Sequence, residues 1–159
     1  MENVSANIFT KFDKDWGLVT AGTKDKFNSM TVSWGAMGTL WRKPVVQIYI
    51  RPTRYTFKFL EENEYFTVSF YDKKYKKALG IMGSKSGRDC DKVKESGLTP
   101  KFLENGVTYE EAKETFVCKK IYMNQMDGSK FPELSKEFYE KGEEKDNIHY
   151  IIFGELVNV

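Results

Sequence analysis

The stretch KFNSMTVSWG, residues 26–35, alternates as a β-strand with two unlike faces. One face carries Asn28, Met30, Val32 and Trp34, and the other carries Ser29, Thr31 and Ser33. The first face is suited to a core. The second is a narrow, flat row of small hydroxyls rather than the long polar side chains typical of a solvent-facing strand. The nature of whatever lies against this row is the first question that the sequence raises.

Strand and helix patterns alternate irregularly on either side of this stretch. Apolar and β-branched runs predict six strands, and amphipathic runs predict short helices between them. The strands are expected over 17–23, 26–35, 44–50, 65–71, 114–126 and 148–159, and the helices over 53–63, 73–83, 87–97 and 132–142. The first two strands are expected to form a hairpin. We predict a mainly β protein with helices in the connections, a six-stranded antiparallel barrel in a single domain spanning 1–159.

Several residues mark the expected boundaries of these elements. Thr53 is a candidate N-cap, and Gly97 and Gly142 are suited to end helices. Gly154 interrupts the last strand and predicts a bulge. A doubly wound parallel sheet is less favoured, because long helices do not alternate with the strands and no GxGxxG turn follows the first strand.

Composition narrows the function classes. The formal net charge is only +2, which argues against a nucleic-acid partner. Two distant cysteines and one histidine, His149, predict neither a disulfide framework nor a metal site. No GxSxG elbow accompanies the histidine, so a serine hydrolase is not indicated. The N-terminus carries no apolar run of signal-peptide length and no stretch is suited to span a membrane, so we expect a cytoplasmic protein.

Two further segments combine hydroxyls, glycine and cations. RPTRYT, residues 51–56, ends a strand and opens a helix, where Thr53, Thr56 and free amides could cradle an anion beside Arg51 and Arg54. An ordinary capped helix with two surface arginines explains this segment equally well. MGSKSGRDCDK, residues 82–92, lacks the spacing of a P-loop, and alone it is also typical of a flexible surface loop. Together with the hydroxyl-lined strand, however, the two segments favour a phosphorylated ligand with a polar ribityl or ribose chain.

Four stretches in this order and spacing resemble the flavin reductase-like family of FMN-binding split-barrel proteins, and within it the flavoredoxin branch. They are NSMTVSWG, PVVQIYIRPTRYT, SKSGRDCDKVKESGLTP and IHYIIFGEL. The resemblance extends from about Gly17 to Val159. It implies a six-stranded antiparallel split barrel, a homodimer, and non-covalently bound FMN near the dimer interface.

The resemblance also implies roles for individual residues. The hydroxyl-lined strand would face the flavin and its ribityl chain, partly through backbone groups, and the next two segments would surround the phosphate. Asp89 is expected to cap the following helix, and His149 to lie near the flavin or nicotinamide. Cys90 and Cys118 are expected to pack. The expected FMN-binding residues are Asn28, Ser29, Met30, Thr31, Ser33, Trp34, Arg51, Thr53, Tyr55, Thr56, Ser86, Gly87, Arg88 and Lys92.

The activity that the resemblance implies is hydride transfer from NAD(P)H to FMN, which supplies reduced flavin or reduces a small acceptor. No side chain need act as a catalytic acid or base, since the flavin carries the chemistry. A second hypothesis is an electron carrier that holds FMN and exchanges electrons with a redox protein partner. A third is a flavin-free barrel that binds another phosphorylated ligand or nucleic acid, which the low net charge disfavours. A homodimer is also expected from the residues, because the long strand 114–126 would otherwise expose an edge.

Overall fold

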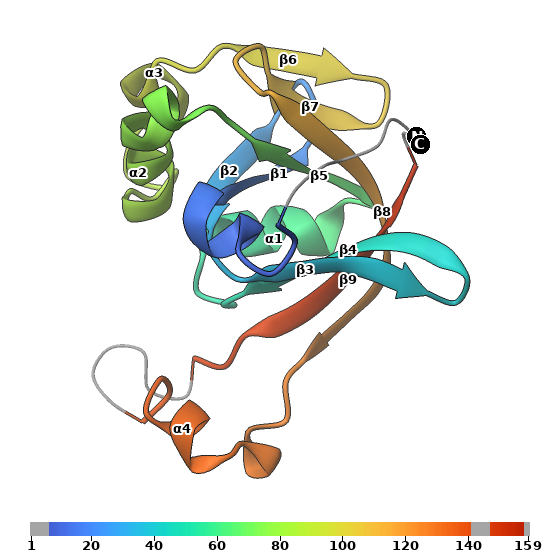
Figure 1. Ribbon diagram of the computed structural model, residues 1–159. Coiled ribbons are helices and arrows are strands. Elements are labelled where there is room, and N and C mark those ends of the chain that lie inside the picture. The colour runs from blue at the N-terminus through green and yellow to red at the C-terminus, as the bar shows by residue number, and fades with distance from the viewer. Residues whose placement is uncertain (1–6, 141–146, 158–159) are drawn as a thin grey trace.

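A computed structural model of the chain describes residues 7–140 and 147–157. Seven strands form one antiparallel sheet in the order β2–β1–β5–β8–β9–β4–β3, and β6 and β7 form a separate hairpin (Figure 1). The strands are β1 (Gly17–Gly22), β2 (Phe27–Val32), β3 (Gly35–Leu40), β4 (Lys43–Ile50), β5 (Tyr65–Phe70), β6 (Pro100–Leu103), β7 (Gly106–Tyr109), β8 (Glu114–Gln125) and β9 (Tyr150–Leu156).

Apart from the first, which precedes β1, the helical elements lie in the connections, as expected. They are η1 (Lys11–Asp15), α1 (Tyr55–Glu62), η2 (Lys73–Tyr75), α2 (Lys76–Ser84), α3 (Lys92–Ser96), η3 (Gly128–Lys130) and α4 (Glu133–Lys136). Helix α1 buries Phe57 and Leu60 in the main core, which also receives Phe12 from η1. No helix in the described ranges is both long enough and apolar enough to cross a membrane.

The six expected strands are all present, but the sheet has a seventh, β3. Its sequence GAMGTL has no strong strand pattern, and it is held as the hairpin partner of β4, with Gly35 opposite Ile48. The hairpin turns at Trp41 and Arg42, which both have positive φ values, 50° and 62°. Such turns usually carry Asn-Gly or Asp-Gly, so this hairpin lacks the sequence signal that would predict it.

The curvature of the sheet follows from its connectivity. Strands β2 and β3 lie at opposite ends of the strand order, yet only Ser33 and Trp34 separate them in the chain. Three Cα steps of about 3.8 Å span at most ~11 Å, so the sheet must curl until its two edges approach. No ladder joins β2 to β3 in the described residues. The predicted barrel is therefore open between these two strands.

Several local predictions are corrected by the structure. Thr53 is not the N-cap of α1, which starts after Arg54, and the Thr53 hydroxyl instead accepts a hydrogen bond from Asn147. The helix expected over 87–97 is confined to α3. Its N-cap is Asp91 rather than Asp89, because the Asp91 carboxylate accepts from the Lys94 amide at 3.1 Å.

Glycine positions were predicted with mixed success. Gly97 ends α3 with a φ of 73°, as expected, whereas Gly142 lies outside the described residues. The irregularity near Gly154 falls on the facing strand, between Lys120 and Tyr122. A side chain at Gly154 would place its Cβ 2.5 Å from atoms of Cys118 and of a neighbouring core ring, so core packing explains this glycine.

The hydroxyl row of β2 faces other parts of the protein. The Ser29 hydroxyl lies 2.8 Å from that of Thr20 and 2.7 Å from that of Tyr109, and Thr31 donates to the Leu79 carbonyl at 2.6 Å. Similar contacts continue across β1 and β5 beneath β7. We call the set Thr20, Ser29, Thr67, Ser69, Thr108 and Tyr109 the hydroxyl layer. It joins the outer face of the sheet to the β6–β7 hairpin.

The strand that was expected to expose an edge, and so to favour a dimer, lies inside the sheet. Strand β8 is not exposed at an edge, because it pairs with β5 on one side and β9 on the other. The two edge strands are β2, against which α2 packs, and β3. An unpaired edge in the described sheet is therefore found on β3.

Candidate functional site

Three cavities follow one another along β2. The Trp34 cavity has a volume of about 320 Å³, the Arg88 cavity about 190 Å³ and the Cys90 cavity about 200 Å³. The first two share Met30 and Arg54, and the last two share Asn28, Tyr55 and Lys92. The cavities are thus neighbouring parts of one groove.

Every residue that the sequence predicted for the site lines this groove. The Trp34 cavity contains Met30, Thr31, Ser33, Trp34, Arg51 and His149. The Arg88 cavity contains Asn28, Met30, Thr53, Tyr55, Thr56, Ser86, Arg88 and Lys92. The Cys90 cavity contains Ser29 and Gly87 as well as Asn28, Tyr55 and Lys92.

The Arg88 cavity is strongly cationic. Arg54, Lys85, Arg88 and Lys92 line it, and none of its lining residues in the described chain is a carboxylate. Lys85 is paired with Glu95, which lies outside the cavity lining. The remaining three cations make this cavity attractive to an anion.

Lys92 is the most unusual of these cations. Its side chain is only 5 % exposed, and its Nζ donates to the Met82 carbonyl at 2.8 Å. Burial, with a smaller contribution from nearby Arg54, lowers the Lys92 pKa to about 8. A buried ammonium is costly unless it is paired, and an anion bound in the cavity would supply the missing counter-charge.

Backbone carbonyl groups hold the guanidinium groups of Arg54 and Arg88 in place. Arg54 Nη2 donates to the Gly83 carbonyl at 2.5 Å, and Arg88 Nη1 donates to the Thr53 carbonyl at 3.1 Å. The Arg88 guanidinium also lies over the Tyr55 ring, 5.0 Å from its centre. Burial, followed by the charge of Arg51, lowers the Arg54 pKa. A guanidinium has five N–H donors, so each arginine keeps donor capacity beyond the bond that fixes it.

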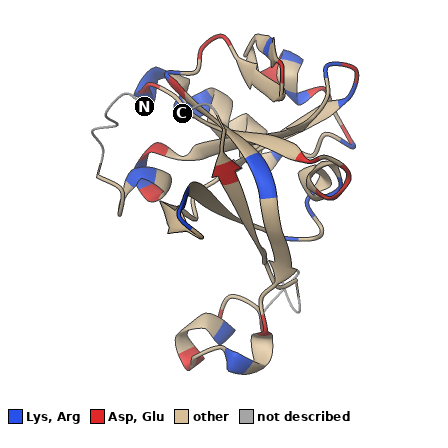
Figure 2. Ribbon diagram, turned by 90° about the vertical axis from the view of Figure 1, so that its right-hand side faces the viewer, with Lys and Arg blue, Asp and Glu red and all other residues tan. Residues whose placement is uncertain are grey.

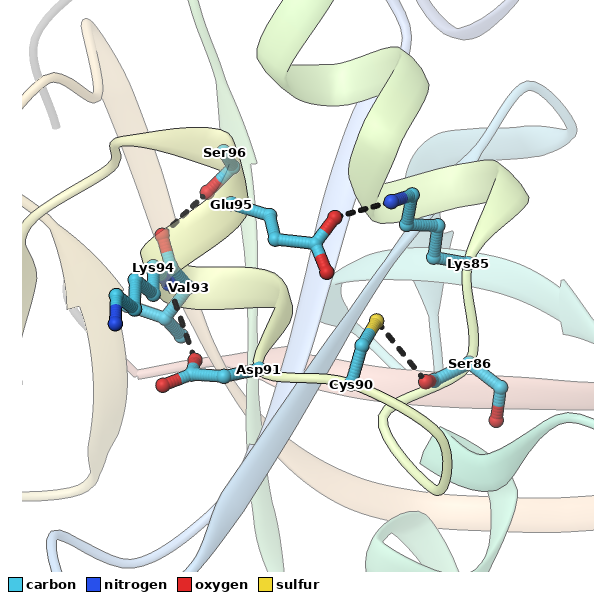
Figure 3. Close-up of polar contacts among 8 residues, drawn as sticks. All are labelled: Lys85, Ser86, Cys90, Asp91, Val93, Lys94, Glu95 and Ser96. Atoms are coloured by element: carbon cyan, nitrogen blue, oxygen red, sulfur yellow. Dashed lines mark hydrogen bonds and ion pairs between the residues drawn. The ribbon is translucent and has the colours of Figure 1, made fainter.

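The loop between α2 and α3 closes the cationic side of the groove. Gly87 packs against Asn28 so closely that a Cβ there would lie 2.1 Å from the Asn28 amide oxygen. Figure 3 shows how the loop is tied together: Lys85 meets Glu95, and the Cys90 thiol points to the Ser86 carbonyl at 3.5 Å. Burial raises the Cys90 pKa, which keeps the sulfur a thiol. Cys90 is half-buried and lines the Cys90 cavity, so the packing role expected for it stays a prediction.

Several predicted hydroxyls are engaged inside the protein. The Thr56 hydroxyl accepts from Asn28 Nδ2 at 2.7 Å, Thr53 accepts from Asn147 at 2.7 Å, and Ser29 belongs to the hydroxyl layer. These bonds shape the walls of the groove. The hydrogen-bond donors that the groove offers to a ligand belong mainly to its cations.

The Trp34 cavity has aromatic walls. Trp34 lies 4.9 Å from the His149 ring, centre to centre, with a 37° tilt, and contacts Phe138 edge-on at 5.6 Å. His149 is 9 % exposed. Burial and the charge of Arg51 lower its pKa to about 4, so the ring is neutral at physiological pH.

Sequence reasoning did not assign Tyr49, Gly83 or Tyr139 to the groove. Tyr49 and Gly83 line the Trp34 cavity, and Tyr139 reaches His149 from the far end of the chain segment between β8 and β9. Tyr49 and Gly83 lie within the stretches 44–56 and 82–92, which could have pointed to them, whereas no motif surrounds Tyr139 and only the tertiary structure brings it to the groove.

The arrangement suits a ligand with a flat ring system and an anionic group. The aromatic Trp34 cavity can hold a ring, and the cationic Arg88 cavity can hold a phosphate. Within the described ranges, no group of three or more His, Cys, Asp or Glu side chains could hold a metal. Both cysteines are free, and Cys118 is fully buried with a raised pKa.

Solved structures share this architecture. The flavoredoxin of Methanosarcina acetivorans is 19 % identical, with a TM-score of 0.69, and the match covers 99 % of this chain and 73 % of that one. An FMN-binding protein from Thermus thermophilus, solved with bound p-hydroxybenzaldehyde, is 16 % identical over 99 % of this chain and 77 % of its own, with a TM-score of 0.70.

An NADH:FAD oxidoreductase from Streptomyces globisporus C-1027, solved in complex with NAD and FAD fragments, is also similar. It is 18 % identical, with a TM-score of 0.64, over 91 % of this chain and 72 % of that one. At these identities the likeness concerns the fold. No curated protein sequence matches the chain. The family model described as the flavin reductase like domain matches residues 9–159, and the chain therefore belongs to the flavin reductase-like family.

Proposed function

We propose that the chain is an oxidoreductase that holds FMN without a covalent bond and passes a hydride from NAD(P)H to the flavin. The reduced flavin is then supplied to another protein or used to reduce a small acceptor. Membership of the flavin reductase-like family supports a flavin as the ligand. The groove supports the phosphorylated form, because its aromatic cavity leads into a cationic one.

The observation that carries the proposal is Lys92. Its ammonium is buried beside Arg54 in a cavity without a lining carboxylate. Arg54, Arg88 and Lys92 would hold the phosphate, with Ser86 and Gly87 closing over it. Because Gly87 has no side chain, the loop can lie directly on Asn28 and leave the cavity open.

The remaining residues divide between the ribityl chain and the ring. Asn28, Met30 and Thr31 run along the groove between the two cavities, so their backbone would follow the ribityl chain. Trp34, Arg51 and His149 would border the ring. The isoalloxazine, when bound, supplies the hydride and electron chemistry. The protein orients it, and the cations near the cavity favour the more negative, reduced state.

An electron carrier is the second candidate. Similarity to a flavoredoxin favours it, and so does an exposed apolar rim at the mouth of the Trp34 cavity. Trp34 and Phe138 are 41 % and 50 % exposed there. A redox protein could dock on this rim, whereas a reductase needs the same opening for a nicotinamide.

We also propose a single-domain, cytoplasmic homodimer. The unpaired edge of β3 and the exposed Trp41 at its hairpin supply a surface that a second copy could cover. Sedimentation of the FMN-loaded protein tests this point, since a monomer that retains FMN would contradict a site completed by the partner.

The decisive experiment is a comparison of FMN with riboflavin, which lacks the phosphate. We expect FMN to bind at least about 100-fold more tightly, since two or more charged hydrogen bonds of roughly 1.5–3 kcal/mol each are lost with riboflavin. Equal affinities would remove the phosphate from the Arg88 cavity. Failure of both ligands to bind would remove the flavin.

The same sample separates the two functions. Under anaerobic conditions, NADH or NADPH should bleach the visible flavin bands of a reductase within the turnover time. A flavin that dithionite reduces but neither nucleotide reduces would identify the electron carrier.

A further inference from the structure

Tyr139 reaches the groove from a segment that projects from the sheet. Residues 126–140, which we call the β8–β9 arm, leave the sheet after β8 and carry α4 away from it (Figure 1). Figure 2 shows the same projection from a second direction, with both signs of charge on its surface. Tyr139 nevertheless is only 8 % exposed, and its hydroxyl oxygen lies 2.7 Å from Nδ1 of His149.

The contact made by Nε2 of His149 decides whether Nδ1 or the Tyr139 hydroxyl is the donor in the bond between them. Arg51 Nε lies 3.4 Å from His149 Nε2, and an arginine N–H can only donate. Nε2 must therefore present its lone pair. A neutral imidazole carries one N–H, so the proton is on Nδ1 and is donated to the Tyr139 hydroxyl oxygen.

Neighbouring rings hold Tyr139 in place. Phe131 stacks on it, with ring centres 5.0 Å apart and a 29° angle, and the Arg51 guanidinium lies 5.8 Å from its ring centre. The charged or titratable groups that line the cavity beside His149 are Arg51, Arg54 and Tyr49. No lining residue of this cavity in the described chain is a carboxylate, so no anionic group competes for the imidazole proton.

We propose that Tyr139 is a positioning residue, which together with Arg51 holds His149 as the Nδ1–H tautomer and so keeps Nε2 as a hydrogen-bond acceptor in the Trp34 cavity. The consequence for turnover rests on the proposed function. A donor group on the second substrate, such as a carboxamide N–H, would compete with Arg51 for this acceptor. The β8–β9 arm thereby contributes the Tyr139 hydroxyl to the site, in addition to the contact of Phe138 with Trp34.

The tautomer can be read directly, because His149 is the only histidine in the chain. Protein labelled with ¹⁵N-histidine should give one imidazole spin system, with Nδ1 protonated and Nε2 unprotonated, unchanged between about pH 6 and pH 8. Tyr139→Phe removes the acceptor but keeps the ring against Phe131 and Arg51. In this variant the ¹⁵N chemical shifts of Nδ1 and Nε2 should move toward each other, because both neutral tautomers become populated.

Tyr49→Phe is the matched control. Tyr49 lines the same cavity, but its hydroxyl accepts from Gln47 rather than meeting His149. The Nδ1–H signature should survive this change. A wild-type ring protonated on Nε2, or a Tyr139→Phe spectrum identical to wild type, would overturn the proposal.

A kinetic readout then addresses the role in turnover. In FMN-loaded protein, Tyr139→Phe should raise the KM for the nucleotide about tenfold with a smaller change in kcat, as expected for one lost hydrogen bond. An unchanged KM would overturn this role. Failure of wild-type protein to bind FMN would instead defeat the proposed function and leave the tautomer result standing.

Discussion

The hydroxyl layer and the Arg88 cavity lie on the two sides of the same strand, β2, and both are rich in polar groups. In the layer, each hydroxyl meets another protein group: Ser29 lies between Thr20 and Tyr109, and Ser69 lies 2.9 Å from Thr108. In the cavity, three cations converge without a carboxylate in the lining. The layer is complete as it stands, whereas the cavity lacks a counter-charge.

Polar residues in a sequence therefore differ in how specifically they indicate a ligand. A row of small hydroxyls is equally compatible with a ligand and with a buried hydrogen-bonded seam, because hydroxyls both donate and accept and can satisfy one another. Cations cannot satisfy one another. A cluster of cations that includes a buried ammonium therefore indicates an anionic partner more specifically than hydroxyls do.

The largest expected effect that tests this contrast comes from Lys92. We predict that Lys92→Met weakens FMN binding by about 100-fold, a loss of ~2–3 kcal/mol that is typical of a charged hydrogen bond. The fold should be retained, since a buried ammonium is replaced by an apolar side chain. Titration of FMN fluorescence measures the affinity.

Lys94→Met is the control for this change, because Lys94 lies on the same helix but is exposed. Its FMN affinity should match that of wild type. Equal affinities for the Lys92 and Lys94 variants would show that the cavity does not hold the phosphate.

A smaller effect is expected in the hydroxyl layer, where a substitution should change stability rather than FMN affinity. Ser29→Ala should lower the free energy of unfolding by about 1–3 kcal/mol, because the Thr20 and Tyr109 hydroxyls lose a buried partner. FMN affinity should stay within about twofold, since this hydroxyl faces β7 rather than the ligand. Chemical denaturation and flavin titration of one sample measure both quantities, and a large loss of affinity at unchanged stability would reverse the assignment.

The smallest effect is the dependence on pH. The Lys92 pKa of about 8 in the fold lies below the ordinary lysine value of 10.5. The unfolded chain therefore binds more protons between these values, and the stability of the free protein should rise as pH increases from 8 to 10.5. Thermal unfolding of the flavin-free protein at pH 7.5 and pH 9.5 checks the sign.

FMN binding should show the reverse trend. An anion favours the protonated ammonium, so affinity should be constant below pH 8 and fall by up to about tenfold at pH 9. The phosphate remains a dianion over this range, since its second pKa is about 6. A Lys92→Met variant should bind with no such step, and a step that persists in this variant would assign the titration to another group.

Periodicity identified most of the fold because each of the six predicted strands carries its own apolar pattern. It missed β3, whose residues are exposed or half-exposed and whose hairpin turns at Trp41 and Arg42 without glycine. It also misjudged which strand is an edge, since the order of strands in a sheet depends on contacts between distant segments. The long strand β8 proved to be interior.

The candidate site could be assembled from the sequence only as a set of short motifs. Resemblance to a family placed residues 28–34, 51–56 and 86–92 around one ligand, and the structure brings all three segments to one groove. Tyr139 was not predictable, because the β8–β9 arm has no motif that would link it to His149.

Local spacing and residue type were enough to predict the alternation of β2, the hydroxyl and cationic composition of the groove, and the succession of the six patterned strands along the chain. Tertiary structure decided which polar groups are satisfied. Thr56 and Ser29 found protein partners, whereas Lys92 was buried beside Arg54. Hydrogen-bond satisfaction and burial depend on groups far apart in the chain, and they are what distinguishes a structural seam from a binding site.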